Sequence, residues 1–266
     1  MIEILSSSFM QKAFLVGIIV SLISGIISVF VVLRRMSFIG AGISHAAFGG
    51  VAIGFFTGIN PTITAIFFSI AIALGIEFVS RKGKVSEDAS IGIFFASSMA
   101  LGIVLISLSR NYNIDLFGYL FGNILAISDR EVFLSFILAV FVIGGIVLFL
   151  KEIFITAYNE EIAQVSGISV RAINILFLIL LSVSIVISIK IVGIILISAL
   201  LVIPGATAQL FAKNLHIMIA TSCVVAVLST VLGLLISYEL DIAPGGSIVL
   251  TATAVFLVSL LFKKRG

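Results

Sequence analysis

The chain has 266 residues, of which 61% are hydrophobic and 10% are charged. Soluble domains are about 45–50% apolar and about 25% charged, so this composition excludes an ordinary water-soluble globule and indicates an integral membrane protein. The net charge of +3 comes from short basic clusters between apolar runs. Such clusters set the orientation of the spans in the membrane and do not indicate a nucleic-acid partner.

Nine apolar runs are long enough, or nearly so, to cross a bilayer, which takes about 20 helical residues. In chain order they are 13–33, 38–58, 61–79, 89–108, 132–150, 172–189, 191–211, 215–237 and 243–262. We therefore predict an all-α, polytopic membrane bundle of about nine spans, forming a single transmembrane domain over residues 1–266. The first run is expected to be a retained span and no cleaved signal peptide, because no positive start precedes it.

The second span carries a histidine and a series of small residues. Small residues recur every four positions, at Gly42, Ala46, Gly50, Gly54 and Gly58. One helix face is thus nearly bare and suits close packing against a neighbouring helix. His45 lies well inside this span, and neutral imidazole is a common ligand for zinc and similar metals. A hydrogen bond to a neighbouring helix would explain the histidine equally well.

A shorter run at 114–127 follows the fourth span. If the basic clusters at 34–35, 81–84 and 263–265 face the cytoplasm, the N-terminus is outside and the C-terminus inside. This alternation requires that the short run does not cross the membrane, so we predict a re-entrant or outer-surface helical segment. Such a segment would lie against protein or a water-filled path. Asp115 opens the segment and could attract a cation near the outer mouth, although an acid at a helix start has an ordinary explanation.

A longer polar stretch, 151–171, lies on the predicted cytoplasmic side. Asn159 can cap a helix, Glu160 and Glu161 suit its first turn, and Gly167 suits its end. The sequence therefore predicts a short exposed helix between two spans.

The remaining ionisable residues give weaker signals. Glu239 and Asp241 lie in the last outer loop, where they could receive a cation or be simple loop residues. Glu77 is one helical turn before Arg81, which favours an i,i+4 ion pair. His216 is expected to be solvated at the inner surface.

No catalytic motif is present. The sequence lacks H-E-x-x-H, G-x-S-x-G and the P-loop pattern G-x-x-x-x-G-K-[ST]. The chain is therefore predicted to be no enzyme, and any energy from ATP must come from another subunit.

Several spaced segments together resemble the metal-ion permease family of ABC importers, whose members carry zinc, manganese or iron. The segments are Ser44-His45-Ala46 with the glycines through Gly54, Asp115-Leu116 with Leu120-Phe121-Gly122, Glu161 with Ala163 and Gly167, Val192-Gly193 with Pro204, and Asp241 with Pro244-Gly245.

The resemblance implies a type II-like ABC importer permease in the inner (cytoplasmic) membrane. It implies a homodimer, two cytoplasmic ATP-binding subunits and an extracytoplasmic solute-binding protein. Residues 158–169, with Asn159, Glu160, Glu161, Ala163 and Gly167, would couple to the ATPase. His45 and Asp115 would meet the ion, with Glu239 and Asp241 at the outer mouth. The transported divalent metal ion is the ligand, and no permanently bound cofactor is expected.

One departure concerns the metal. Many relatives carry Asp four residues before the histidine, where this chain has Ala41. We favour zinc because imidazole suits it, with manganese or iron as alternatives.

Rival functions remain open. They are a secondary transporter driven by an ion gradient, an ABC permease for cobalamin or an iron chelate, and an intramembrane enzyme. The first usually needs carboxylates inside its spans, and the enzyme lacks its motifs.

Overall fold

The computed structural model describes residues 8–109, 122 and 127–263, and within these ranges every regular element is a helix. Nine helical stretches in the described part are long and apolar enough to cross a membrane. The prediction of an all-α bundle with about nine spans is therefore confirmed.

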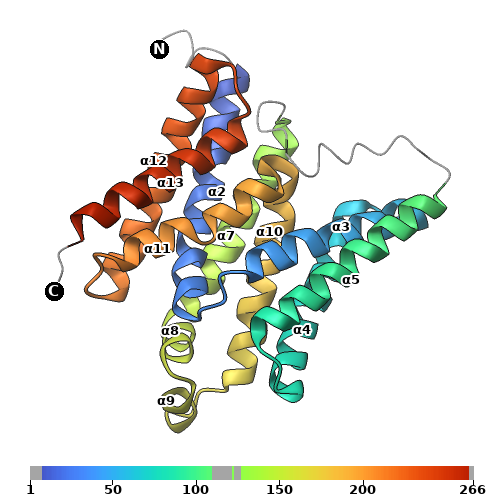
Figure 1. Cartoon of the computed structure of the whole chain (residues 1–266), viewed down its shortest axis with the longest axis vertical. Helices are drawn as coiled ribbons and strands as arrows, with labels where there is room; N and C mark the ends of the chain where they lie inside the picture. Colours follow the sequence, from blue (N-terminus) through green and yellow to red (C-terminus); the bar gives the residue numbers. More distant parts are fainter. Residues whose placement is uncertain (1–7, 110–121, 123–126, 264–266) are drawn as a thin grey trace.

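The helices α3, α4 and α5 pack on one another and form one group, seen on the right in Figure 1. Their bounds are Ile39–Thr57, Pro61–Gly83 and Glu87–Leu108. Two of them begin at capping side chains, because Asn60 Oδ1 accepts a hydrogen bond from the Thr62 amide and the Ser86 hydroxyl oxygen accepts one from the Ala89 amide. We call these three helices the α3–α5 group.

The second group contains α2, α7, α12 and α13. Their bounds are Ser8–Leu33, Asp129–Leu148, Leu215–Leu240 and Pro244–Phe262. Helix α2 packs on α7 and α12, and α12 packs on α13. Helix α10, Val170–Leu200, contacts both groups and joins them (Figure 1).

Buried hydroxyl groups hold the second group together inside the membrane. The hydroxyl oxygens of Ser21 on α2 and Thr230 on α12 are 2.6 Å apart. The Ser222 hydroxyl donates to the Gly25 carbonyl oxygen at 2.7 Å. Interhelical hydrogen bonds of this kind replace the hydrophobic driving force, which lipid does not supply between helices.

The seventh span departs from the prediction of one continuous run over 191–211. Helix α10 kinks at Gly193, whose φ of 83° and ψ of 166° are reached almost only by glycine. The chain breaks again after Leu200, and α11, Ile203–Gln209, starts with Pro204 in its first turn. Two bent pieces therefore replace the expected straight helix.

Two short helices connect α7 to α10. They are α8, Leu150–Tyr158, and α9, Glu160–Val165. They lie at the same end of the bundle as the end of α2 and the α4–α5 connection, opposite the start of α2 (Figure 1). The basic clusters assign this end to the cytoplasm, so we call it the cytoplasmic end.

Candidate functional site

Close glycine contacts fix α3 between α4 and α5. A Cβ added to Gly50 would lie 2.6 Å from the Cα of Ala65 on α4, and one added to Gly49 would lie 2.7 Å from the carbonyl oxygen of Ser98 on α5. The prediction of a closely packed small-residue face is confirmed at Gly42, Gly50 and Gly54, where an added Cβ would lie 2.5–2.6 Å from a neighbouring helix residue. Gly58 is an exception, because it ends α3 with a φ of 74° and has open space around it.

His45 projects from α3 and is half-buried. Its Nδ1 lies 2.8 Å from the carbonyl oxygen of Ala41, and its ring meets Phe95 of α5 edge-on at 4.7 Å between centroids. A carbonyl oxygen can only accept, so Nδ1 carries the proton and Nε2 keeps its lone pair. The histidine is thus held by its own helix in the tautomer that can bind a metal through Nε2.

In the part of the chain that the structure describes, acidic or sulfur ligands do not gather around this imidazole. Within the described ranges, no group of three or more His, Cys, Asp and Glu side chains could hold a metal ion. Among the described residues, His45 is therefore not part of a ready-made group of metal ligands.

Asp115 lies outside the described residues, as does most of the segment 114–127. Gly122 is described, and a Cβ there would come within 2.4 Å of the Gly193 amide nitrogen and 2.5 Å of the Val192 carbonyl carbon. This part of the segment therefore touches the kink of α10. Whether the segment crosses the membrane stays a prediction.

The polar stretch 151–171 forms the predicted short helix, α9. The Asn159 side chain caps it by accepting the amides of Glu161 and Ile162 at 2.9 and 3.0 Å. Gly167, with a φ of 76°, ends the turn after the helix, where its amide donates to the Gln164 carbonyl at 3.0 Å. The local interpretation of these capping residues is confirmed.

Helix α9 has one buried and one exposed face. Ala163 is fully buried, whereas Val165 is 91% exposed and Ile162 and Tyr158 are also exposed. Glu161 is exposed on the same short helix. An exposed apolar patch at a polar end of the bundle is suited to contact with another protein.

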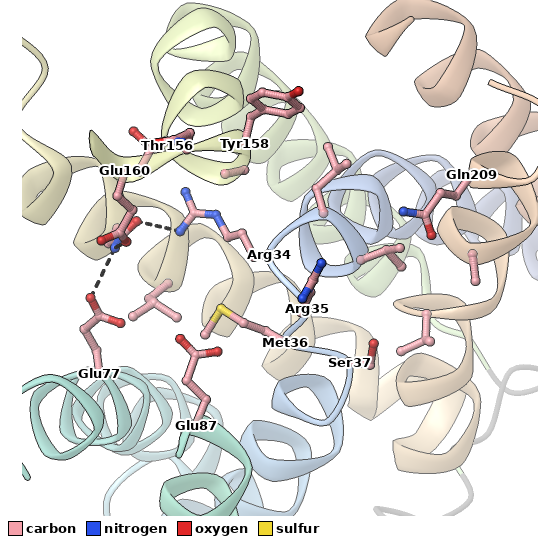
Figure 2. Close-up of a pocket in the computed structure, with 18 residues that line it drawn as sticks. Arg34, Arg35, Met36, Ser37, Glu77, Glu87, Thr156, Tyr158, Glu160 and Gln209 are labelled. Carbon is pink, nitrogen blue, oxygen red and sulfur yellow. Dashed lines mark hydrogen bonds between the residues drawn. The ribbon is translucent and has the colours of Figure 1, made fainter. Parts of the chain in front are cut away.

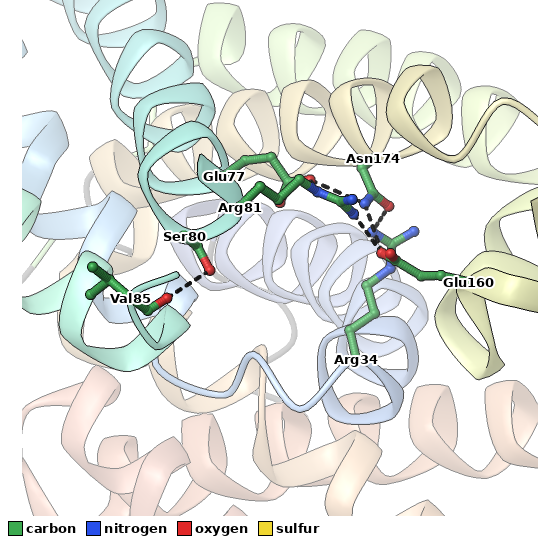
Figure 3. Close-up of polar contacts among 7 residues, drawn as sticks. All are labelled: Arg34, Glu77, Ser80, Arg81, Val85, Glu160 and Asn174. Atoms are coloured by element: carbon green, nitrogen blue, oxygen red, sulfur yellow. Dashed lines mark hydrogen bonds and ion pairs between the residues drawn. The ribbon is translucent and has the colours of Figure 1, made fainter. Parts of the chain in front are cut away.

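Glu160 points back toward the bundle and takes part in a polar cluster (Figure 3). Its Oε1 accepts from Arg81 Nη2 at 2.5 Å and from Asn174 Nδ2 at 3.3 Å. Asn174 Nδ2 also donates to Glu77 Oε1 at 3.2 Å, and Arg81 Nε donates to the same oxygen. The predicted pair of Glu77 and Arg81 is thus confirmed, but it belongs to a larger network.

Arg34 completes this network, which we call the Asn174 cluster: Arg34, Glu77, Arg81, Glu160 and Asn174. Arg34 Nη1 donates to Asn174 Oδ1 at 2.7 Å, and the guanidinium lies 4.4 Å from the ring centre of Phe177. Burial lowers the pKa of Arg34 to about 10, because desolvation disfavours the cation, and Glu77 and Glu160 partly offset this effect. Arg34 therefore remains charged at neutral pH.

A cavity of about 800 Å³ opens beside the Asn174 cluster at the cytoplasmic end (Figure 2). Its lining includes Arg34, Glu77, Glu87, Glu160 and Asn174. These residues come from the end of α2 and from α4, α5, α9 and α10. The cavity thus lies where the two helix groups and the short cytoplasmic helices meet.

The outer acids have an ordinary loop geometry. Asp241 ends α12 with a φ of 51°, and its amide donates to the Ser237 carbonyl. Glu239 and Asp241 are both exposed, and a role for them at an outer mouth stays a prediction. His216 is exposed near the start of α12, as expected.

Asn174 was not singled out by the sequence analysis, although it is central to the cluster and only 4% exposed. A signal was available, since an amide in the first turns of an apolar span needs polar partners. Arg34 was interpreted only as an orientation signal. Of the residues singled out, the structure joins Glu77, Arg81 and Glu160, whereas His45 lies apart on α3.

Comparisons with known proteins place the chain among membrane permeases of ABC transporters. The model of the ABC 3 transport family matches residues 6–263. The manganese transport system membrane protein MntC of Listeria monocytogenes is 39% identical over 97% of this chain and 92% of its own. The high-affinity zinc uptake system membrane protein ZnuB of Haemophilus influenzae is 35% identical over 95% of this chain and 97% of its own.

A solved structure gives the same answer for the fold. A chain of PsaBC from Streptococcus pneumoniae, in complex with Fab, superposes with a TM-score of 0.88 at 37% identity. The match covers 99% of this chain and 95% of that chain.

Proposed function

The chain belongs to the ABC 3 transport family and is a multi-pass membrane permease of the metal-ion type, and from this premise we propose that it forms the membrane pathway of an ATP-driven importer for divalent transition metal ions. The observation that carries the proposal is the family match over residues 6–263. The single transmembrane domain would lie in the inner membrane.

The exposed face of α9 supports an ATPase partner. A cytoplasmic ATPase subunit would bind the exposed patch of Tyr158, Ile162 and Val165, with Glu161 beside it. Asn159 and Gly167 would fix the shape of this coupling segment, and buried Ala163 would anchor it to the bundle. The pathway would lie between two copies of the chain, and an extracytoplasmic solute-binding protein would deliver the ion.

The ion would pass His45. Its Nε2 is free to ligate because Nδ1 is held by the Ala41 carbonyl. One imidazole per chain binds a metal weakly, which suits a pathway that has to release its ion. Asp115, Glu239 and Asp241 would attract the cation at the outer side.

Zinc and manganese are both compatible with this pathway. We expected zinc from the imidazole, whereas the relatives described above are named for manganese and for zinc. We therefore propose a divalent transition metal as substrate, and competition between the two ions during uptake would rank them.

The test is metal uptake into proteoliposomes that contain the permease, its ATPase and its binding protein. We expect His45→Ala to lower ATP-dependent uptake at least about tenfold. His216→Ala is the matched control, because His216 is an exposed histidine outside the proposed path, and it should keep the wild-type rate. Equal rates for both variants would remove His45 from the pathway.

The same vesicles separate the proposal from a secondary transporter. A secondary transporter would continue uptake without the ATPase and would stop when an ionophore collapses the proton or sodium gradient. That result would contradict the proposed ATP-driven importer. Uptake that needs ATP and ignores the ionophore supports it.

A further inference from the structure

We propose that the Asn174 cluster is the link through which the coupling helix α9 moves the α3–α5 group and, with that group, His45. This rests on the proposed function, because it assumes that an ATPase acts on α9. Arg81, Glu160 and Asn174 are then positioning residues for transport, and none of them touches the metal ion.

The first step is that the α3–α5 group moves as one body. Glycines bring its helices into backbone contact, since a Cβ on Gly54 would lie 2.6 Å from the Cα of Pro61, and one on Gly49 would lie 2.7 Å from the Ser98 carbonyl oxygen. Packed backbones cannot shift independently without leaving voids. A displacement applied to α4 therefore reaches α3 and His45.

The second step is that α9 has little direct contact with this group. The main backbone neighbours of α9 are α8 and α10. Its connection to α4 is made by long side chains, from Glu160 to Arg81. Without that bridge, a movement of α9 would reach α8 and α10 and would arrive at α4 only indirectly.

The third step is that the bridge is stronger than an ordinary surface ion pair. Arg81 and Glu160 are both partly exposed, and an isolated pair of this kind would be weak. Here the contacts close into a ring, because Arg81 and Asn174 each donate to both Glu77 and Glu160. Asn174 is buried and also accepts a hydrogen bond from the Arg34 cation. The Asn174 side chain is therefore held in place, and it holds the two carboxylates in turn.

The cavity shows why a link is needed at this place. It separates the cytoplasmic ends of α4 and α5 from those of α2 and α11, and the cluster lies along its wall (Figures 2 and 3). The open space offers no packing between these helix ends, and the two groups otherwise meet through α10, which packs on α3 and α4. The polar ring joins α9 and α10 to α4 at the wall of this space, where α9 and α4 have little backbone contact of their own.

A charge swap tests the link in the complete transporter. We would measure metal uptake per ATP hydrolysed for Arg81→Glu, for Glu160→Arg and for the double variant. We expect each single variant to lower this ratio at least tenfold. The double variant should recover only in part, because the new carboxylate at position 81 faces Glu77 and the new guanidinium at position 160 faces Arg34. Lys82→Glu is the matched control, because Lys82 lies over Phe78 and is one residue from Arg81, and its ratio should stay unchanged.

A reversible cross-link separates transmission from simple stabilisation. In a Cys223→Ser background with cysteine-free partners, Arg81→Cys and Glu160→Cys would be joined by a short bis-methanethiosulfonate. We expect a low uptake-to-ATP ratio before joining, recovery after joining and loss again on reduction. These states compare the same folded protein, so a folding defect cannot imitate the pattern.

Each result has one meaning. Wild-type vesicles without ATP-dependent uptake would overturn the proposed function itself. Active wild-type vesicles with normal ratios in the single variants would overturn only the link. So would a cross-link that leaves the ratio unchanged or lowers it further, since the contact would then be idle or would have to open during transport.

Discussion

Replacing Gly50 by alanine tests how tightly α3 is held against α4. The new Cβ would lie 2.6 Å from the Ala65 Cα, 3.0 Å from the Phe68 Cβ and 3.1 Å from the Thr64 carbonyl oxygen. The first and third of these atoms are backbone and cannot turn aside. Reaching an ordinary contact of at least 3.4 Å to Ala65 requires a shift of about 0.8 Å, the difference between 3.4 and 2.6.

The magnitude follows from two opposing effects. Alanine in a helix interior gains about 0.5–1 kcal/mol over glycine, and overpacking a tight contact costs about 1–3 kcal/mol. Gly144→Ala in α7 is the matched control, because a Cβ there meets nothing within 4 Å. Both variants receive the same helix gain, so their difference isolates the packing cost of about 1–3 kcal/mol.

The assay is thermal unfolding in detergent, followed by circular dichroism at one scan rate. At about 2–4 °C per kcal/mol for a chain of this size, Gly50→Ala should unfold about 2–12 °C below Gly144→Ala. If the two variants unfold at the same temperature, or Gly50→Ala at the higher one, α3 and α4 are not in the contact described here.

Three further changes have defined outcomes. Val165→Asp should abolish co-purification with the ATPase. It should change the free energy of unfolding by less than about 0.5 kcal/mol, because Val165 is 91% exposed. Retained binding would show that the ATPase docks on another surface. Asn159→Ala should weaken α9 by about 1 kcal/mol and speed amide exchange at Glu161, whereas Asn159→Asp should keep the protection. Asn174→Leu should lower the free energy of unfolding by about 1–3 kcal/mol, because Arg34 loses its amide partner, and unchanged unfolding would contradict the central place of Asn174.

Most of the fold could be predicted because a bilayer imposes one strong condition on every span. A crossing helix must be apolar over about 20 residues, so counting apolar residues locates it. The same count could not reveal the break in the seventh span. Gly193 and Pro204 act through backbone angles and a missing N–H, and neither property changes the hydropathy of the run.

The site divides in a similar way between local and long-range features. The cap at Asn159 was predictable, because it joins residues two and three positions apart. The bond between Asn174 and Glu77 was not predictable, because the two residues are 97 positions apart and lie on different helices. Glu160 combines both features: its place in the first turn of α9 follows from the sequence, and its pairing with Arg81 does not.

The structure also changes the meaning of Ala41. The lack of an aspartate one turn before His45 removes a possible ligand, and an aspartate there could also have oriented the imidazole. The backbone supplies the second role, because the Ala41 carbonyl accepts the Nδ1 proton and fixes the ring. What the chain lacks at this position is therefore a charge, and not an oriented histidine. At the proposed pathway site, a neutral histidine without this carboxylate would bind a dication less tightly, which would favour release over retention.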